Sequence, residues 1–240
     1  RVHVADLEFD LDTRTSEINP WAGWLINANY EHGTGEFRVQ EAASFLREHR
    51  SYDRVFFDIR RYNRISPRRQ INARLVFGGW VGGDELPLER RFSVGGIGTI
   101  PGFDFRREGI GTDVGQCTSP LLPDNGGAEC ERVALAQIEY RHELLSELFD
   151  VFNRNGIRVR GQVFRVKPTA VAFVDAGRGW LVGPRAGTLQ YPAGSLPPFG
   201  TYRTDVGAGI DLGLFGIYVA KAVSSSKEPA NLFVRIRDRF

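Results

Sequence analysis

Thr201–Leu212 reads Thr-Tyr-Arg-Thr-Asp-Val-Gly-Ala-Gly-Ile-Asp-Leu, and its side chains alternate in kind. The even positions, from Tyr202 to Leu212, are mostly apolar, whereas the odd positions carry Arg203, Asp205 and Asp211 among glycines. Successive side chains of a β-strand point to opposite faces, so this stretch predicts a strand with one apolar and one charged face. In a soluble sandwich the apolar face is the core, and in a membrane barrel it meets lipid while the polar face lines the lumen. The alternation alone leaves both architectures open.

The same alternation recurs along the chain and predicts about eight strands. With Thr201–Leu212, they cover residues 25–31, 52–65, 70–80, 133–144, 167–180, 216–224 and 231–240. A short helix is expected over residues 40–47, and residues 143–154 suit either an extended strand or a short helix. Residues 82–131 are too long and too rich in Gly and Pro for a simple hairpin, and connections of this length are usually functional.

Composition excludes several classes of protein. The 240 residues are 42% hydrophobic and carry a net charge of +2, which argues against a disordered chain and against binding to nucleic acid. The sequence holds no uncharged apolar run of 18 residues, which excludes a transmembrane helix but not a barrel, whose strands alternate. Aromatic residues near predicted strand ends, such as Trp21, Trp24, Trp80 and Trp180, suit the interfacial girdles of a barrel.

The chain has no methionine and begins Arg-Val-His-Val. We therefore expect a processed or truncated N-terminus, with either a cleaved signal peptide or a larger upstream part. Cys117 and Cys130 bracket a loop rich in Pro, Gly and Asn, which predicts a disulfide in an oxidising compartment, the alternative being two free thiols. No histidine lies near either cysteine, so no metal site is expected.

Signals for catalysis are weak. The four histidines are scattered, no Gly-x-Ser-x-Gly motif is present, and Gly96-Ile97-Gly98 lacks the third glycine of a dinucleotide-binding turn. We expect a protein that is not an enzyme and has no cofactor.

An ordered set of motifs runs from Asp12 to the C-terminus. It consists of Asp12-Thr13-Arg14 with Asn19-Pro20-Trp21-Ala22-Gly23, Leu86-Pro87 leading to Gly95-Gly96, Ile100-Pro101-Gly102-Phe103, Glu139-Tyr140-Arg141, Val171–Gly177, Val206–Ile210 and the terminal Arg239-Phe240. In order and approximate spacing this set resembles the BamA/TamA outer-membrane protein assembly family, of the bacterial surface antigen type.

The resemblance implies an all-β, antiparallel transmembrane barrel in a bacterial outer membrane. Residues 1–240 would form the last eight strands of a barrel that has sixteen in the family, with a long extracellular loop at about 82–131. It also implies a function in inserting or translocating outer-membrane proteins, so the expected partners are outer-membrane lipids, client proteins or other subunits. Eight strands close only into a narrow barrel filled by side chains. The alternative is therefore a structural barrel subunit or anchor without assembly activity.

The resemblance also assigns roles to single residues. The family's loop arginine, which pairs with strand carboxylates, is Pro101 here, and Glu139 and Asp175 occupy the carboxylate positions. Either another cation, such as Arg106 or Arg107, neutralises these carboxylates, or the loop lock is lost. From the residues themselves, Glu139 and Asp175 are either acids with raised pKa values or partners of lumen cations, for which the candidates are Arg141, Arg203 and Arg235. The terminal Phe240 is expected to be an insertion signal, or else an interfacial anchor.

Overall fold

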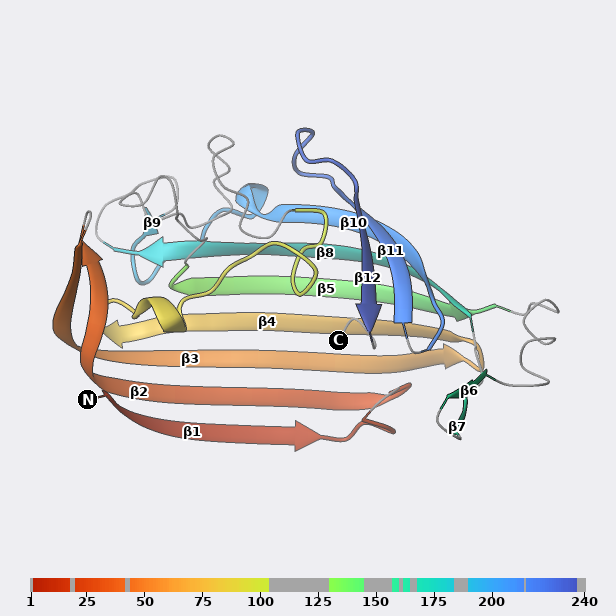
Figure 1. Ribbon diagram of the computed structural model, residues 1–240, viewed down its shortest axis with the longest axis horizontal. Helices are drawn as coiled ribbons and strands as arrows, with labels where there is room; N and C mark the ends of the chain where they lie inside the picture. Colours follow the sequence, from red (N-terminus) through yellow and green to blue (C-terminus); the bar gives the residue numbers. More distant parts are fainter. Residues whose placement is uncertain are drawn as a thin grey trace.

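A computed structural model describes residues 2–17, 20–41, 44–103, 130–144, 157–159, 162–164, 168–183, 190–213 and 215–236. Nine of its strands form one antiparallel sheet in the order β1-β2-β3-β4-β5-β8-β10-β11-β12 (Figure 1). These strands are β1 (Val2–Asp12), β2 (Gly23–Glu41), β3 (Ser44–Ser66), β4 (Arg69–Gly83), β5 (Arg132–Glu143), β8 (Thr169–Val182), β10 (Arg203–Asp211), β11 (Phe215–Ala222) and β12 (Asn231–Ile236). The predicted all-β antiparallel architecture is confirmed.

Short elements complete the described chain. Strands β6 (Ile157–Val159) and β7 (Gln162–Phe164) form a separate hairpin, β9 (Gln190–Tyr191) pairs in parallel with β8, and two 3-10 turns lie at Leu88–Arg90 (η1) and Phe199–Thr201 (η2). Within the described residues no helix is long and apolar enough to cross a membrane.

Two sequence expectations about the elements were wrong. The ninth strand, β1, was not predicted, although Leu7, Phe9 and Leu11 alternate there with four acidic residues. The short helix expected over residues 40–47 is absent, because the described residues of that stretch pair across the β2–β3 hairpin, with Gln40 opposite Phe45 and Glu41 opposite Ser44. The stretch 143–154 is described only to residue 144, so its alternatives lie outside the described residues.

Strand β10 buries its charged side chains and exposes its apolar ones. On β10, Asp205 is fully buried and Arg203 nearly so, while Val206 and Ile210 on the other face are 45% and 48% exposed. Strand β11 shows the same alternation of burial, with Ile217 and Val219 exposed and Gly216, Tyr218 and Ala220 buried between them. A soluble sandwich would do the reverse, whereas a barrel wall in lipid presents its apolar row outward. This polarity decides between the two architectures that the alternation left open.

The sheet curls around its buried face, which we call the concave face, and β12 crosses the view of Figure 1 at a steep angle to β1–β5. The two ends of the strands differ. At the loop end, β4 leads into residues 84–131, and at the turn end, β3 returns as β4 through Pro67 and Arg68. Residues 84–103 run back from the loop end over the concave face (Figure 1).

Candidate functional site

The candidate site is the tip of the long loop, residues 94–103, where it meets the concave face. Val94, Ile100 and Phe103 are at most 1% exposed and pack with Val133 and Leu135 of β5. Burying a side chain of this size stabilises by about 1.5–3 kcal/mol. The tip is therefore part of the hydrophobic core of the molecule.

The tip is shaped by a tight turn around two glycines. Gly96 has a φ of 81°, which favours glycine, and its N–H donates to the carbonyls of Phe103 at 2.8 Å and Ile100 at 3.2 Å. The Thr99 hydroxyl accepts from the N–H of Gly95 at 2.8 Å and donates to its carbonyl at 2.9 Å. The predicted motif residues thus close the turn mainly through backbone groups.

Strand β10 holds the tip through two charged side chains. The Arg203 guanidinium donates to the Val94 carbonyl at 2.8 Å and lies 4.6 Å from the centre of the Phe103 ring. The N–H of Gly102 donates to the Asp205 carboxylate. Hydrogen bonds to charged groups contribute about 1.5–3 kcal/mol each, so these contacts fix the tip firmly.

Strands β5 and β12 hold the tip from two other directions. Gln137 of β5 donates to the Thr99 carbonyl at 2.7 Å. On β12, Asn231 donates to the Pro101 carbonyl at 3.0 Å and Arg235 donates to the carbonyl of Ile97 at 3.2 Å. The tip thereby connects the middle of the sheet to its last strand.

The predicted lumen carboxylates lie on the same face. Glu139 is buried, accepts from Arg141 at 3.1 Å and from Asn72 at 3.2 Å, and shares Arg141 with Asp211, which lies 2.6 Å from the guanidinium. Asp175 is fully buried and stands in register between Gln137 and Asp205. The structure thus brings Glu139 together with Arg141, and it places Arg203 and Arg235 against the loop.

Pro101 stands at the position of the family's loop arginine, and the described loop tip is held by side chains of the strands. Arg203, Arg235, Asn231 and Gln137 donate to its carbonyls, and Asp205 accepts from the Gly102 N–H. The cationic candidates Arg106 and Arg107 lie outside the described residues, as do Phe240 and Cys117. Cys130 is fully buried, and the described part of the chain holds no free cysteine. The predicted disulfide between Cys117 and Cys130 stays a prediction.

A buried ionic cluster on β3 and β4 was not predicted. Asp58 accepts from Arg60 and Arg74 at 2.7 Å each, and Arg74 also donates to Gln137 at 3.2 Å. Because Gln137 holds the Thr99 carbonyl, the cluster is linked to the loop tip. The alternation on β3, with Asp58 and Arg60 on one face, carried the signal for this cluster.

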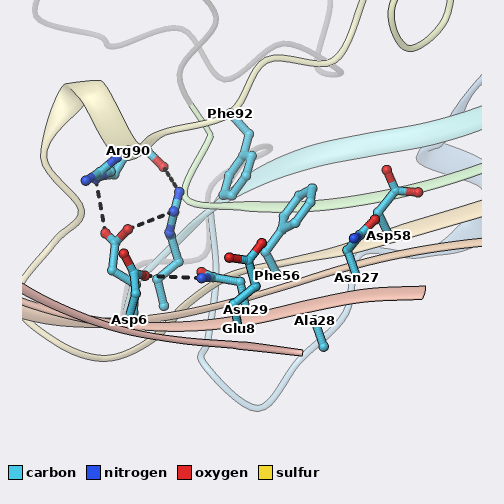
Figure 2. A pocket seen from close by; sticks show the side chains of 11 residues that line it. Asp6, Glu8, Asn27, Ala28, Asn29, Phe56, Asp58, Arg90 and Phe92 are labelled. Atoms are coloured by element: carbon cyan, nitrogen blue, oxygen red, sulfur yellow. Dashed lines mark hydrogen bonds and ion pairs between the residues drawn. The ribbon is translucent and has the colours of Figure 1, made fainter. Parts of the chain in front are cut away.

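A hollow lies on the concave face beside Arg90 and Phe92, at the beginning of the long loop (Figure 2). Its walls come from three strands and the loop, and it is lined by Asp6, Glu8, Asn27, Ala28, Asn29, Glu31, Arg54, Phe56, Asp58, Arg90 and Phe92. Glu31 is one of its lining residues and lies 3.0 Å from both Arg54 and Arg90. Within the described residues no group of three or more His, Cys, Asp or Glu side chains is placed to hold a metal ion.

A buried carboxylate also lies where the long loop joins β5. Glu131, just before β5, is 3% exposed and accepts from the Val182 N–H at 2.8 Å. Burial raises the pKa of this carboxyl, an effect that the nearby Arg91 only partly opposes. The long loop is thus attached to the sheet at its junction with β5 as well as at its tip.

Comparison with known proteins adds two findings. A model of the Omp85 superfamily domain matches residues 5–214. Among solved structures, the fold is similar to BamA from Haemophilus ducreyi lacking POTRA domains 1–3, with a TM-score of 0.61 and 14% identity over 98% of this chain and 42% of that chain. The chain therefore spans less than half the length of that relative, and the match concerns the fold. No curated protein matches the chain.

Proposed function

This chain belongs to the Omp85 superfamily, and from that membership we propose that it works in a bacterial outer membrane as a barrel that inserts or translocates outer-membrane proteins. The membership and the BamA-like fold confirm the resemblance seen in the sequence motifs. The family consists of outer-membrane barrels, and the inverted polarity of the sheet agrees with that placement. We propose no catalytic step and no cofactor.

The observation that carries the proposal is the last strand and its attachment to the loop. Within the described residues β12 pairs only with β11. Its outward residues Leu232, Val234 and Ile236 are 77%, 58% and 81% exposed. Its inner side is held by the loop tip through Asn231 and Arg235. An edge strand with free backbone groups is a template for an added strand.

The lengths of the strands support a second part of the proposed mechanism, which is local thinning of the bilayer. Strands β10 and β11 have nine and eight described residues, against 23 in β3. A strand needs about 9–11 residues to cross a bilayer. A wall at or just below this limit beside β12 would thin the adjacent bilayer. A client strand would thus meet a free edge and the thinnest lipid at one place, while the loop tip governs how firmly β12 is held.

The test is a client-folding assay. We expect phospholipid vesicles that contain this chain to fold a urea-unfolded barrel protein faster than vesicles that contain an unrelated barrel at equal mass, as measured by gel mobility without boiling. A photo-reactive residue at Val234 of β12 should capture the client. The same photo-reactive residue at Val219 should not capture the client, because Val219 also faces outward but lies on β11, one strand in from the edge.

A folding rate equal to that with the unrelated barrel would contradict the proposal. That outcome would favour the alternative, a structural barrel subunit or anchor of an outer-membrane complex. Capture at Val219 as efficient as at Val234 would show that the client meets the lipid-facing wall generally and not the edge.

A further inference from the structure

Three of the four histidines of the chain lie together on the outer face of β1–β3, at the loop end of the sheet. His3 of β1 stands directly opposite Thr34 of β2, and the Thr34 hydroxyl lies 3.4 Å from Nε2 of His49 on β3. His32 comes two residues before Thr34, so strand alternation places it on the same face. Its neighbour Glu31 is buried on the concave face, whereas His3 and His49 are exposed.

A carboxylate holds His32 in one orientation. Nδ1 of His32 lies 2.9 Å from Oδ1 of Asp53, the residue opposite it on β3, and the same oxygen accepts from the Tyr30 hydroxyl at 2.6 Å. Because an ionised carboxylate only accepts hydrogen bonds, Nδ1 carries a hydrogen, and Nε2 is left on the side of the ring away from Asp53. The side chain of His32 is 44% exposed, so Nε2 is open to a ligand from outside the sheet.

The histidines lie at the height of the lipid headgroups on the loop side of the sheet. Trp24, at the turn end of the same outer face, is 42% exposed, and Thr34 follows it ten residues later on β2. A barrel strand crosses the bilayer in about 9–11 residues, and aromatic side chains mark both borders. Tyr30, beside the histidines, is 41% exposed. Long loops of such barrels face the exterior, so the anion available here is the phosphate of an outer-leaflet lipid.

The charge of this surface depends on pH, because histidine is the side chain that ordinarily changes its charge between pH 5 and 8. Among the residues whose side chains the structure describes, the other charged groups around the cluster are Glu36 opposite His49, Asp53 opposite His32, Asp84, which accepts from the Ser51 N–H at 2.8 Å, and Arg47, two residues before His49. These groups give a net negative charge while the histidines are neutral and a net positive charge once all three are protonated.

We propose that His3, His32 and His49, once protonated, bind the phosphate of an outer-leaflet lipid, so that mildly acidic surroundings turn this binding on. His32 donates to the phosphate from Nε2 while Asp53 stabilises its charge, and His3 and His49 approach from the two sides of Thr34. Hydrogen bonds between charged donors and phosphate oxygens are about twice as strong as those between neutral groups. The site requires only that the sheet crosses a bilayer and does not depend on the insertion of client proteins.

The test measures the binding of fluorescent diphosphorylated lipid A to the folded chain in a neutral detergent, by fluorescence polarisation at about pH 5.5 and about pH 7.5. One charge near a lipid surface changes affinity about five-fold, so the unmodified chain should bind at least about ten-fold more tightly at the lower pH. A phosphate monoester itself loses charge over this interval, so a gain in affinity must come from the protein.

The variant His3→Gln/His32→Gln/His49→Gln should bind no more tightly at the lower pH than at the higher one. The matched control is His142→Gln, which removes the fourth histidine, on β5 at the turn end, and should keep the gain. If the triple variant does not fold, as judged by gel mobility without boiling, the three single variants decide the question, each with a loss of about five-fold expected at the lower pH.

Several results would overturn the site. One is binding by the unmodified chain that does not tighten at the lower pH, and another is a gain that survives in the triple variant. Equal binding of the same glycolipid after removal of its phosphates would show that phosphate is not the group recognised. Full displacement of the lipid by inorganic phosphate at equal ionic strength would assign the site to free phosphate, and binding that requires added Zn²⁺ would assign it to a metal ion.

Discussion

Replacing Gly102 by alanine should release the loop tip from the sheet. A Cβ atom at Gly102 would lie 2.6 Å from the Asp205 Cβ and 2.7 Å from the backbone nitrogen of Ala222, and a backbone atom in a sheet cannot move aside cheaply. Overpacking of this kind costs about 1–3 kcal/mol, and loss of the Gly102 hydrogen bond to the charged Asp205 adds about 1.5–3 kcal/mol. The docked tip should therefore be destabilised by about 3–5 kcal/mol.

Hydrogen–deuterium exchange of the folded chain, read by mass spectrometry, measures this release. At about 1.4 kcal/mol for each factor of ten, the tip amides should exchange at least about 100-fold faster in Gly102→Ala. The Gly96 amide, which is bonded to the Phe103 carbonyl, is the reporter. Amides of β8 should keep their protection.

The matched control is Gly98→Ala in the same loop tip. A Cβ atom there meets no atom within 4 Å, so the exchange of the tip should stay as in the unmodified chain. Equal protection in the two variants, or a tip that stays protected in Gly102→Ala, would refute the reasoning that backbone fit against β10 and β11 holds the loop.

Three further predictions concern charge and redox state. Asp58→Asn leaves two partly buried arginines without their shared, buried carboxylate and should lower the free energy of unfolding by about 1.5–3 kcal/mol in a urea titration, whereas Asp12→Asn, at an exposed ion pair, should leave the midpoint unchanged; equal effects would argue against a buried carboxylate cluster. The raised pKa of Glu131 means that the native state binds its proton more tightly than the unfolded chain, so the protein should lose stability as the pH rises through that pKa. Glu131→Gln should abolish that slope in thermal melts between mildly acidic and neutral pH, and a slope that persists would assign it to another group. Cys117 and Cys130 should resist thiol labelling until a reductant is added, and labelling of the unreduced protein would disprove the disulfide.

The strand pattern was readable from the sequence because it depends only on neighbouring residues. Thr201–Leu212 alternates almost without interruption, and which face is buried follows once the fold is known. Strand β1 was missed although Leu7, Phe9 and Leu11 carry the same signal, because its first residues, Val2 and Val4, lie on the other face and obscure the period. The helix expected at residues 40–47 failed because cross-strand pairing outweighed local helix propensity.

The contacts of the site could not be predicted from the sequence, because they join residues about 40 to 140 positions apart. The resemblance directed attention to a cation in the loop, and Pro101 left two alternatives, another loop cation such as Arg106 or Arg107, or a lost lock. Among the described residues the loop tip is held from the strands, where Arg203 and Arg235 reach loop carbonyls and Asp205 accepts from the Gly102 N–H. Every residue has a backbone carbonyl, so no residue type in the loop sequence identifies the positions that the strand side chains bind.

Because the strands hold the loop tip mainly through its backbone carbonyls, these hydrogen bonds do not depend on the identity of the loop's side chains. Val94, Ile97, Thr99 and Pro101 are each gripped by their carbonyl groups, so a saturation mutagenesis library of the tip should tolerate wide chemical variety at Ile97, which is exposed. Intolerance should concentrate at Gly102, at the buried Val94, Ile100 and Phe103, and at the strand side chains that hold the tip, which lie far away in the primary structure.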